Sequence, residues 1–457
     1  MAGSNELSFL CIGSLGTGFL ESSLERGLAL DPDFIGADAG SVDGGPNALA
    51  GVAPGWPDSA YRRDLDLLMK GAARKGIPLL IGSSATSGRD WGVDWFAGMA
   101  RDTATSIGRK LKVAKIYSEL SADYVVEKLR AGKLHALDAA PHYDEDVIRG
   151  SVRIVGVMGA EQFQAALDLG ADVILGGRAT DTSIFAAIPL ARGFDPGLAW
   201  HAGKIAECGT SAAEPRRRLD VLHIAMERDS FVVQPLADGI RCTPFSVASL
   251  QLHEVADPFT MVEPGWTTDL RQVRYDAVSD RAVRVSGATS VRTPYTVKLE
   301  GVERAGFQRM FMFGIRDETF LQNLDAWMAF IDGDITTRCE ELLGPGGRDL
   351  VKVHMRVYGR DGVMGPREPI KQFEGHEAFF VVDVTGPDPE TTETATSVIW
   401  YAFMHAKSPG WRGGATVAWP FSKAVFDIGE VFQFNAHHVI DVDDPMEPFR
   451  IELEEMG

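Results

Sequence analysis

The sequence predicts an α/β fold with an N-terminal doubly wound parallel sheet and a second, smaller α+β domain. Three observations support this: apolar runs alternate with amphipathic stretches in the first half, glycines end several of those stretches, and the pattern becomes strand-rich after Gly209. Strands that alternate with helices imply right-handed crossovers and hence a parallel sheet. A chain of 457 residues exceeds what one core usually serves, so two domains are expected.

Six apolar runs of strand length end in small or charged residues. The carboxyl ends of parallel strands meet at one edge of a sheet, and open α/β sheets bind their ligands along that edge. We therefore expect the six strand ends to converge. The runs are Leu7 to Ile12, Phe34 to Ala37, Pro78 to Ile81, Val113 to Tyr117, Val152 to Val157, and Asp172 to Leu175.

Amphipathic stretches between these runs predict the helices. A glycine after a helix commonly takes the left-handed conformation that ends it, and Gly76, Gly132 and Gly170 stand in such positions. The predicted helices include Arg63 to Lys75, Trp95 to Leu111, Ala122 to Ala131, and Ala160 to Leu169.

The character of the chain changes after Gly209, where the polar segment Glu214 to Arg218 interrupts the alternation. Strand-like runs follow it, with helices expected at Phe320 to Ile331 and Thr391 to His405. We therefore divide the chain into an α/β ligand-binding domain over residues 1–214 and an α+β domain over residues 215–457.

Composition restricts the partners and the compartment. The formal net charge of −19 repels phosphate backbones and anionic lipid, so we expect neither a nucleic acid nor a membrane as partner. No run approaches the roughly 20 apolar residues of a spanning helix. The first twenty residues lack a basic leader and the four cysteines show no CxxC spacing, so a cytoplasmic protein without a zinc knuckle or disulfide framework is predicted.

Two loops at the predicted edge are candidates for substrate binding. Gly13, Gly16 and Gly18 follow the first strand in a GxxGxG spacing, which differs from the dinucleotide fingerprint and lacks the lysine of a Walker loop. A tight turn without a ligand explains these glycines equally well. The third run opens onto Ser83, Ser84 and Thr86, whose hydroxyl and N–H groups are donors for a developing negative charge.

Acidic residues at the same edge are candidates for proton transfer. Asp38 ends the second strand and is a candidate base or metal ligand, although an Asx turn would also account for it. Glu119 follows the fourth strand and is the alternative base. A Mg²⁺ ion held by Asp38, Asp43 or Glu119 would stabilise the same negative charge, so magnesium is a candidate cofactor.

Arg178 follows the last of the six runs, just before a helix expected at Ile184 to Leu190. A guanidinium there is suited to binding a substrate carboxylate bidentately, assisted by the helix N-terminus. Asp181 is a catalytic candidate, but either Thr180 or Asp181 would also serve as the helix cap. The structural alternative is that Arg178 pairs with a carboxylate of the protein, such as Asp181 or Glu207, and braces the sheet edge.

Four segments resemble the acyclic terpene utilisation protein AtuA family, from the start of the chain to about residue 330. The chain departs from the family pattern at Thr182 and at Asp38 to Gly40. The segments are Ile12 to Phe19, Gly176 to Phe185, Lys204 to Gly209, and Pro294 to Gly301; the matching positions are Gly13, Gly16, Gly18, Arg178, Asp181, Glu207 and Cys208.

The resemblance implies a role in the catabolism of branched acids and their CoA thioesters. We therefore expect a lyase that adds or removes water, or cleaves a C–C bond, next to a carbonyl of a small carboxylic acid or its CoA thioester. Proton removal next to a carbonyl needs a positioned base and donors for the enolate oxygen. The alternatives are a hydrolase of a thioester or amide, and a non-catalytic ligand-binding subunit of a multi-protein enzyme. We also expect a homo-oligomer, with a small partner subunit as a further candidate.

Overall fold

The computed structural model describes residues 6–42, 44–51, 55–370, 372, 374–405 and 417–457. The chain divides into two compact units, one of Met1–Glu303 with Phe434–Gly457 and the other of Arg304–Gln433. Residues 215–303, which the sequence analysis assigns to the second domain, thus belong to the first unit, together with the C-terminal segment. The division lies at Glu303 and Gln433 and not at residue 215.

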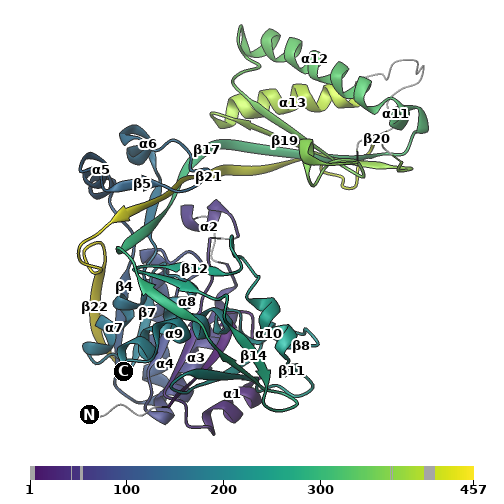
Figure 1. Ribbon diagram of the computed structural model, residues 1–457. Coiled ribbons are helices and arrows are strands. Elements are labelled where there is room, and N and C mark those ends of the chain that lie inside the picture. The colour runs from purple at the N-terminus through teal and green to yellow at the C-terminus, as the bar shows by residue number, and fades with distance from the viewer. Residues whose placement is uncertain (1–5, 43, 52–54, 371, 373, 406–416) are drawn as a thin grey trace. The chain divides into compact units, whose positions relative to one another are not determined.

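A ten-stranded mixed sheet forms the centre of the first unit (Figure 1). Its five middle strands pair in parallel in the order β1-β2-β3-β7-β4. The α/β class and the parallel sheet are therefore confirmed. These strands are β1 (Leu7–Ser14), β2 (Phe34–Asp38), β3 (Leu79–Gly82), β4 (Leu111–Tyr117) and β7 (Val173–Gly176).

The fifth apolar run takes a different place. Strand β6 (Arg153–Gly156) pairs antiparallel with β17 (Thr296–Ile315), with Val155 opposite Glu300. The prediction that Val152 to Val157 joins the parallel sheet is therefore wrong. A short, buried apolar run looks the same in sequence whichever partner it pairs with, so periodicity alone does not fix its neighbour.

Antiparallel strands extend the parallel core on both sides. β9 (Leu222–Met226) pairs with β1, and β10, β15 and β14 follow it outward, while β22 pairs with β4 at the opposite edge. The strand-rich pattern after Gly209 therefore marks a continuation of the same sheet and not a new domain. The outer strands are β10 (Ser230–Pro235), β14 (Arg274–Ala277), β15 (Val283–Ser286) and β22 (Arg450–Met456).

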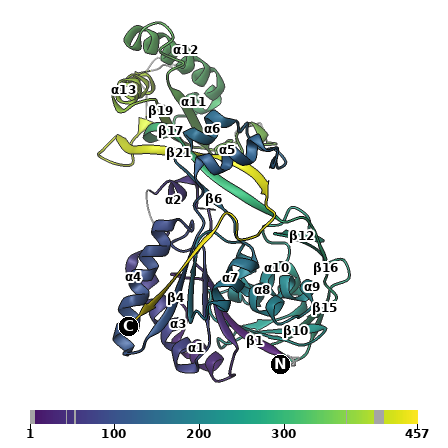
Figure 2. The same cartoon turned by 90° about the vertical axis from the view of Figure 1, so that its left-hand side faces the viewer.

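Helices cover both faces of this sheet, as Figure 2 shows. Helices α3 and α4 lie on one face and α7, α8 and α9 on the other, so side chains along β1 alternate between two cores. Phe9 and Cys11 belong to one cluster, while Leu10 and Ile12 belong to the other. The helices are α1 (Glu21–Leu28), α3 (Asp58–Lys75), α4 (Asp90–Ile107), α7 (Ala160–Asp168), α8 (Asp181–Ala191) and α9 (Pro196–Ala206).

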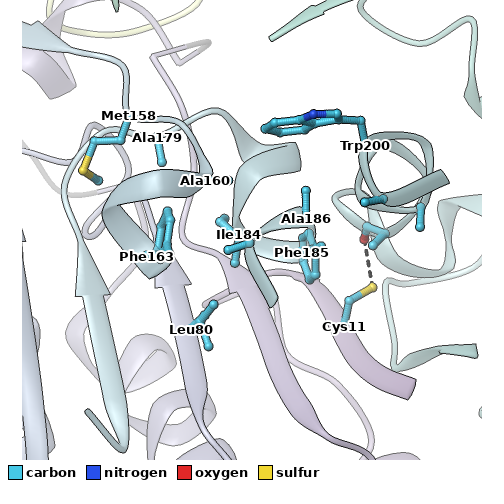
Figure 3. Close-up of a cluster of buried hydrophobic side chains, with 14 of the residues drawn as sticks. Cys11, Leu80, Met158, Ala160, Phe163, Ala179, Ile184, Phe185, Ala186 and Trp200 are labelled. Carbon is cyan, nitrogen blue, oxygen red and sulfur yellow. Dashed lines mark hydrogen bonds between the residues drawn. The ribbon is translucent and has the colours of Figure 1, made fainter. Parts of the chain in front are cut away.

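Helix α8 approaches the sheet closely because glycines face it. A Cβ atom on Gly36 would lie 2.5 Å from the Phe185 ring, and one on Gly82 would lie 2.3 Å from Ile184 Cδ1. Figure 3 shows Ile184 and Phe185 in a cluster of buried hydrophobic side chains that also contains Leu80. The close packing fixes the N-terminus of α8, which carries the candidate residue Asp181, against the ends of β2 and β3.

Further elements complete the first unit. Among them, β12 (Thr260–Glu263) and the extended strand β17 supply acidic residues to the site described below. The others are α2 (Pro46–Ala50), α5 (Ala122–Arg130), β5 (Leu134–Ala136), α6 (Glu145–Gly150), a 3-10 turn (Gly209–Ala212), β8 (Ala213–Glu214), β11 (Arg241–Cys242), α10 (Pro244–Leu250), β13 (Trp266–Asp269) and β16 (Thr289–Arg292).

The second unit is a two-layer α+β fold. One face of its antiparallel sheet packs on α12 and α13 around the buried Phe313, Trp327 and Phe380. Its elements are the later part of β17, α11 (Glu318–Gln322), α12 (Leu324–Leu343), β18 (Lys352–Tyr358), a 3-10 turn (Gly365–Arg367), β19 (Ala378–Gly386), α13 (Pro389–His405), β20 (Val417–Ala418) and part of β21 (Val425–Asp441). Across the described residues, no helix has the length and apolarity needed to cross a membrane.

The loop between β3 and α4 has an unusual backbone. Ser83, Ala85 and Thr86 have φ angles of +48°, +55° and +80°, a region that side chains with a Cβ atom rarely occupy. Gly88 has φ +65°, and a Cβ atom there would lie 2.1 Å from the backbone nitrogen of Arg178. Strained backbone of this kind persists only where surrounding structure holds it and is concentrated at functional sites.

The close approach of Gly88 can be tested against a glycine with the same backbone conformation. Gly76 has φ +69° with open space around it, so Gly76→Ala should cost only the conformational penalty of roughly 1–2 kcal/mol. Gly88→Ala should cost clearly more, because its methyl group meets fixed backbone. Urea denaturation of the two variants measures the difference, and equal losses would contradict the packing described here.

Candidate functional site

Arg178 follows β7 at the carboxyl-terminal edge of the parallel sheet, where the sequence predicts ligand binding. Its Nε donates to Glu300 Oε2 at 2.9 Å, and its Nη1 donates to Asp181 Oδ1 and to Ser83 Oγ, each at 3.1 Å. The residue is 9% exposed and Glu300 is 4% exposed. Burial by itself lowers the pKa of Arg178, but Glu300 and Asp181 outweigh this effect and raise it.

The pairing with Glu300 corresponds to the structural alternative for Arg178. Glu300 occupies two guanidinium nitrogens, Nε and, at 3.4 Å, Nη2. The sequence pattern did not identify Glu300 as the partner. The available signal was the pair of charged residues Lys298 and Glu300 within the strand-like segment Val297 to Val302. A substrate carboxylate would have to compete with Glu300 for this guanidinium, so the substrate-binding role stays a prediction.

Helix α8 begins where Asp181 can meet Arg178. Thr180 is the cap, since its hydroxyl accepts the N–H of Ser183 at 3.2 Å. Asp181 is therefore not needed as the cap and turns towards Arg178. Its side chain is 28% exposed, in contrast to the buried Glu300, so Asp181 is the end of this charged group that solvent reaches.

Asp38 lies on the same edge, at the end of β2, and is 7% exposed. Its Oδ2 accepts the N–H of Gly40 at 2.9 Å, as in the Asx turn considered above. Its Oδ1 is buried and has no hydrogen-bond partner within the described part of the chain. Burial and the negative charge of Asp181 raise the pKa of Asp38 well above its usual value, although Arg178 opposes them.

Two further acidic residues extend this group. Glu207 accepts hydrogen bonds from Lys204 Nζ at 2.5 Å, three residues earlier in the chain, and from Thr182 Oγ1 at 3.1 Å. Burial raises the pKa of Glu263 to about 7, while Thr180 and Thr182 favour its charged form. We call the set Asp38, Asp181, Glu207, Glu263 and Glu300 the carboxyl cluster. Its cations are Arg178, Lys204 and Lys298.

The glycine loop is filled by a side chain of the protein itself. The N–H groups of Gly16 and Gly18 donate to Asp64 Oδ2 at 2.9 and 3.0 Å, and Asp64 is 1% exposed. A Cβ atom on Gly13 would lie 3.3 Å from Leu219 and 3.4 Å from the backbone of Cys208. The described geometry therefore accounts for these glycines by close packing and by the Asp64 carboxylate, and substrate binding by them stays a prediction.

In the loop that contains Ser83, Ser84 and Thr86, the backbone N–H groups are already hydrogen-bonded, so hydroxyl groups are the candidate donors to a ligand. The N–H groups of Ser83, Ser84 and Thr86 donate to the backbone carbonyls of Gly177, Gly176 and Ala39. Ser83 Oγ accepts from Arg178, and Thr86 Oγ1 lies 3.0 Å from the hydroxyl of Tyr61. Ser84 Oγ is buried without a hydrogen-bond partner among the described residues, so it is the hydroxyl of this loop that remains available.

Glu119 belongs to a neighbouring group. Both of its oxygens accept from Arg153 Nη1, at 2.6 and 2.7 Å, and Oε1 also accepts the N–H of Asp90. Within the described part of the chain, none of its hydrogen-bond partners belongs to the carboxyl cluster. The backbone links the two groups, because Ser118 Oγ accepts the N–H of Arg178 and donates to the carbonyl of Gly88. Asp38 and Glu119 are thus not alternative bases in one group, and a catalytic Glu119 stays a prediction.

The sequence predicts a magnesium ion bound by Asp38, Asp43 or Glu119, but the described part of the chain shows no group of side chains placed to bind a metal ion. There, no three His, Cys, Asp or Glu side chains are arranged to hold a metal ion. Asp43 lies outside the described residues. Magnesium stays a prediction.

Comparison with known proteins identifies one family. The sequence model for "Acyclic terpene utilisation family protein AtuA" matches residues 53–434. The match includes Arg178, Asp181, Glu207 and Glu300, and it begins after the glycine loop and Asp38. No curated protein and no solved structure matches the chain.

The buried ion pair can be tested by a double-mutant cycle. Arg178→Met leaves Glu300 buried without its main partner and should cost roughly 3–5 kcal/mol of unfolding free energy, as should Glu300→Leu. The double variant removes both charges and should lose much less than the sum. Arg153→Met is the matched control: both side chains of the Arg153–Glu119 pair are 24% exposed, so its loss should be smaller. Additive losses at Arg178 and Glu300 would contradict direct coupling.

The raised pKa of Glu263 predicts a pH-dependent stability. A carboxyl group with a folded-state pKa of about 7 supports the fold while it is protonated and destabilises it once it is charged. Wild type should therefore lose stability relative to Glu263→Gln as pH rises from the unfolded-state value near 4.5 through about 7, by at most about 3 kcal/mol. Denaturant titrations of both proteins across this range measure the difference. A constant difference would show that Glu263 titrates normally.

Proposed function

The chain belongs to the acyclic terpene utilisation AtuA family, and on this premise we propose that it is a lyase. The reaction would add or remove water, or cleave a C–C bond, next to a carbonyl of a small carboxylic acid or its CoA thioester. The observation that carries the proposal is Asp38, a buried carboxyl at the end of a parallel strand with its Oδ1 unpartnered among the described residues. Its surroundings favour the protonated form.

A protonated carboxyl next to a second carboxylate is the arrangement that acid–base chemistry requires. Environments that separate the pKa values of two acidic groups assign one as acid and the other as base. In the proposed elimination Asp181, which solvent reaches, removes the proton from the carbon next to the carbonyl. Asp38 gives its proton to the departing hydroxyl group as the C–O bond breaks, and a double bond and water result.

Other residues in the site support the charge that develops on the carbonyl oxygen. Ser84 Oγ is an available hydroxyl donor within the described residues, and Arg178 is a fixed positive charge oriented by Glu300. Preorganised donors and charges of this kind stabilise a transition state without reorganising during the reaction. No step is assigned to a magnesium ion.

The hydrolase alternative has less support. A cysteine hydrolase needs a thiolate, and burial together with Glu207 raises the pKa of Cys208 to about 12, so its thiol stays protonated at neutral pH. Only a measurement of turnover distinguishes a lyase from the alternative of a non-catalytic ligand-binding subunit.

Deuterium exchange tests the proposal. Small carboxylic acids and their CoA thioesters, branched and straight, are incubated with the protein in D₂O, and NMR follows deuterium incorporation at the carbon next to the carbonyl. Wild type should label at least one compound, and Asp38→Asn should slow formation of the elimination product by roughly 10²–10⁴-fold, because an amide cannot transfer the proton.

Asp58→Asn is the control, since Asp58 lies at the exposed start of α3 and pairs with Arg62. It should label and turn over substrate at the wild-type rate. Wild-type turnover in a folded Asp38→Asn protein would remove Asp38 from the mechanism. Absence of both labelling and product from every compound tested would count against the lyase and favour a binding subunit.

A further inference from the structure

Arg89 is a buried cation without a counter-charge bound to it. It precedes α4, is 6% exposed, and its buried Nε has no hydrogen-bond partner in the described part of the chain. Within the described residues, no hydrogen bond or ion pair is formed by the rest of its guanidinium either. The guanidinium lies over the Trp91 ring, with the ring centroid 4.8 Å from Cζ.

Such an arrangement is costly unless something else neutralises it. Burying a charge without a partner costs several kcal/mol, and buried arginines are normally paired for this reason. Burial lowers the pKa of Arg89 and Arg153 adds to this effect, while the charge of Glu119 opposes them, and a guanidinium stays charged in proteins. An anion that binds at this position would relieve the cost.

A second guanidinium approaches the same point. A Cβ atom on Gly51 would lie 2.8 Å from Arg89 Nη1 and 3.9 Å from Arg153 Nη2, so both groups face this glycine. Arg153 is held in place by Leu49, whose carbonyl accepts from Nε at 3.0 Å, and by Glu119, which accepts from Nη1. These bonds use the other nitrogens of Arg153 and leave Nη2 directed towards Gly51.

The acidic residues nearby are already engaged. Glu119 is bonded to Arg153 and to the N–H of Asp90, and Asp90 Oδ1 accepts the N–H of Glu119. Burial, followed by the charge of Glu119, raises the pKa of Asp90 to about 6, with Arg450 opposing. Asp90 stands in the first turn of the 18-residue helix α4, whose N-terminus carries a partial positive charge. The positive charge of Arg89 is therefore not balanced by a bonded carboxylate.

We propose that Arg89, at the start of α4, and Arg153, on β6, form a binding site for an oxyanion, either a carboxylate or a phosphate group of a ligand. Two guanidinium groups that converge beside a helix N-terminus match the geometry of such anions. The site adjoins the carboxyl cluster, because Gly88 lies against the backbone of Arg178. It is separate from the substrate-binding role predicted for Arg178, and it does not depend on the proposed lyase activity.

The test uses inorganic phosphate and succinate as probes, each compared with sodium chloride at equal ionic strength. The melting temperature of wild type should rise with at least one probe, because a ligand that binds only the folded state stabilises it. In Arg89→Met the apparent affinity should fall by about 10- to 150-fold, the equivalent of one charge-assisted hydrogen bond. A response to succinate alone assigns a carboxylate, and one to phosphate alone assigns a phosphate ester such as those of coenzyme A.

The melting temperature of Arg89→Met in sodium chloride, without a probe, distinguishes an anion-binding role of Arg89 from a structural role. Removal of an unpaired buried charge should leave Arg89→Met as stable as wild type or more stable, whereas loss of a structural brace would lower its melting temperature. Gly51→Ala is a second variant that keeps both arginines and places a methyl group against Arg89. It should weaken the response to the probe, whereas Gly76→Ala, also left-handed but in open space, should not.

Wild-type affinity for the probe in a folded Arg89→Met protein would overturn the proposal, as would a wild-type protein that responds to neither probe. Asp38→Asn distinguishes this site from the proposed reaction. That variant should keep the full anion response even where turnover is lost, so failure of the lyase proposal leaves the anion site standing, and the reverse also holds.

Discussion

The ion pair between Arg178 and Glu300 is the interaction on which the candidate site depends. It joins the end of a parallel strand to β17, a strand that follows more than a hundred residues later. A buried charge without its partner is strongly unfavourable, so these two segments must meet for either side chain to be tolerated. Their meeting also brings Asp181 and the neighbouring Asp38 into one electrostatic group, in which each carboxyl affects the protonation of the others.

The carboxyl cluster contains more acids than cations. Asp38, Asp181, Glu207, Glu263 and Glu300 share three basic partners, Arg178, Lys204 and Lys298. In a buried group the excess is relieved most simply by protonation, because a neutral carboxyl is less costly to bury than a carboxylate. Burial is the main cause of the raised pKa values of Asp38 and Glu263, and the negative charge of Asp181 adds to it.

Local patterns predicted much of this architecture. Five of the six apolar runs form the parallel sheet, and Gly76 takes the left-handed conformation expected after α3. The features that local patterns did not predict depend on contacts between distant segments of the chain. The run at Val152 to Val157 pairs with β17, and nothing in its own residues specifies that partner. The role suggested for Arg178 meets a competitor in Glu300, 122 residues away, while Arg89 stands out only when its lack of a partner in the described chain is seen.

The Asp64 carboxylate within the glycine loop has a consequence for how this edge of the sheet is organised. In nucleotide-binding α/β proteins the corresponding loop donates its N–H groups to a phosphate of the ligand, so the ligand helps to shape the loop. Here an internal anion, 46 and 48 residues along the chain, accepts those hydrogen bonds. These hydrogen bonds hold the loop without a small molecule, so ligand binding need not supply the free energy to order it.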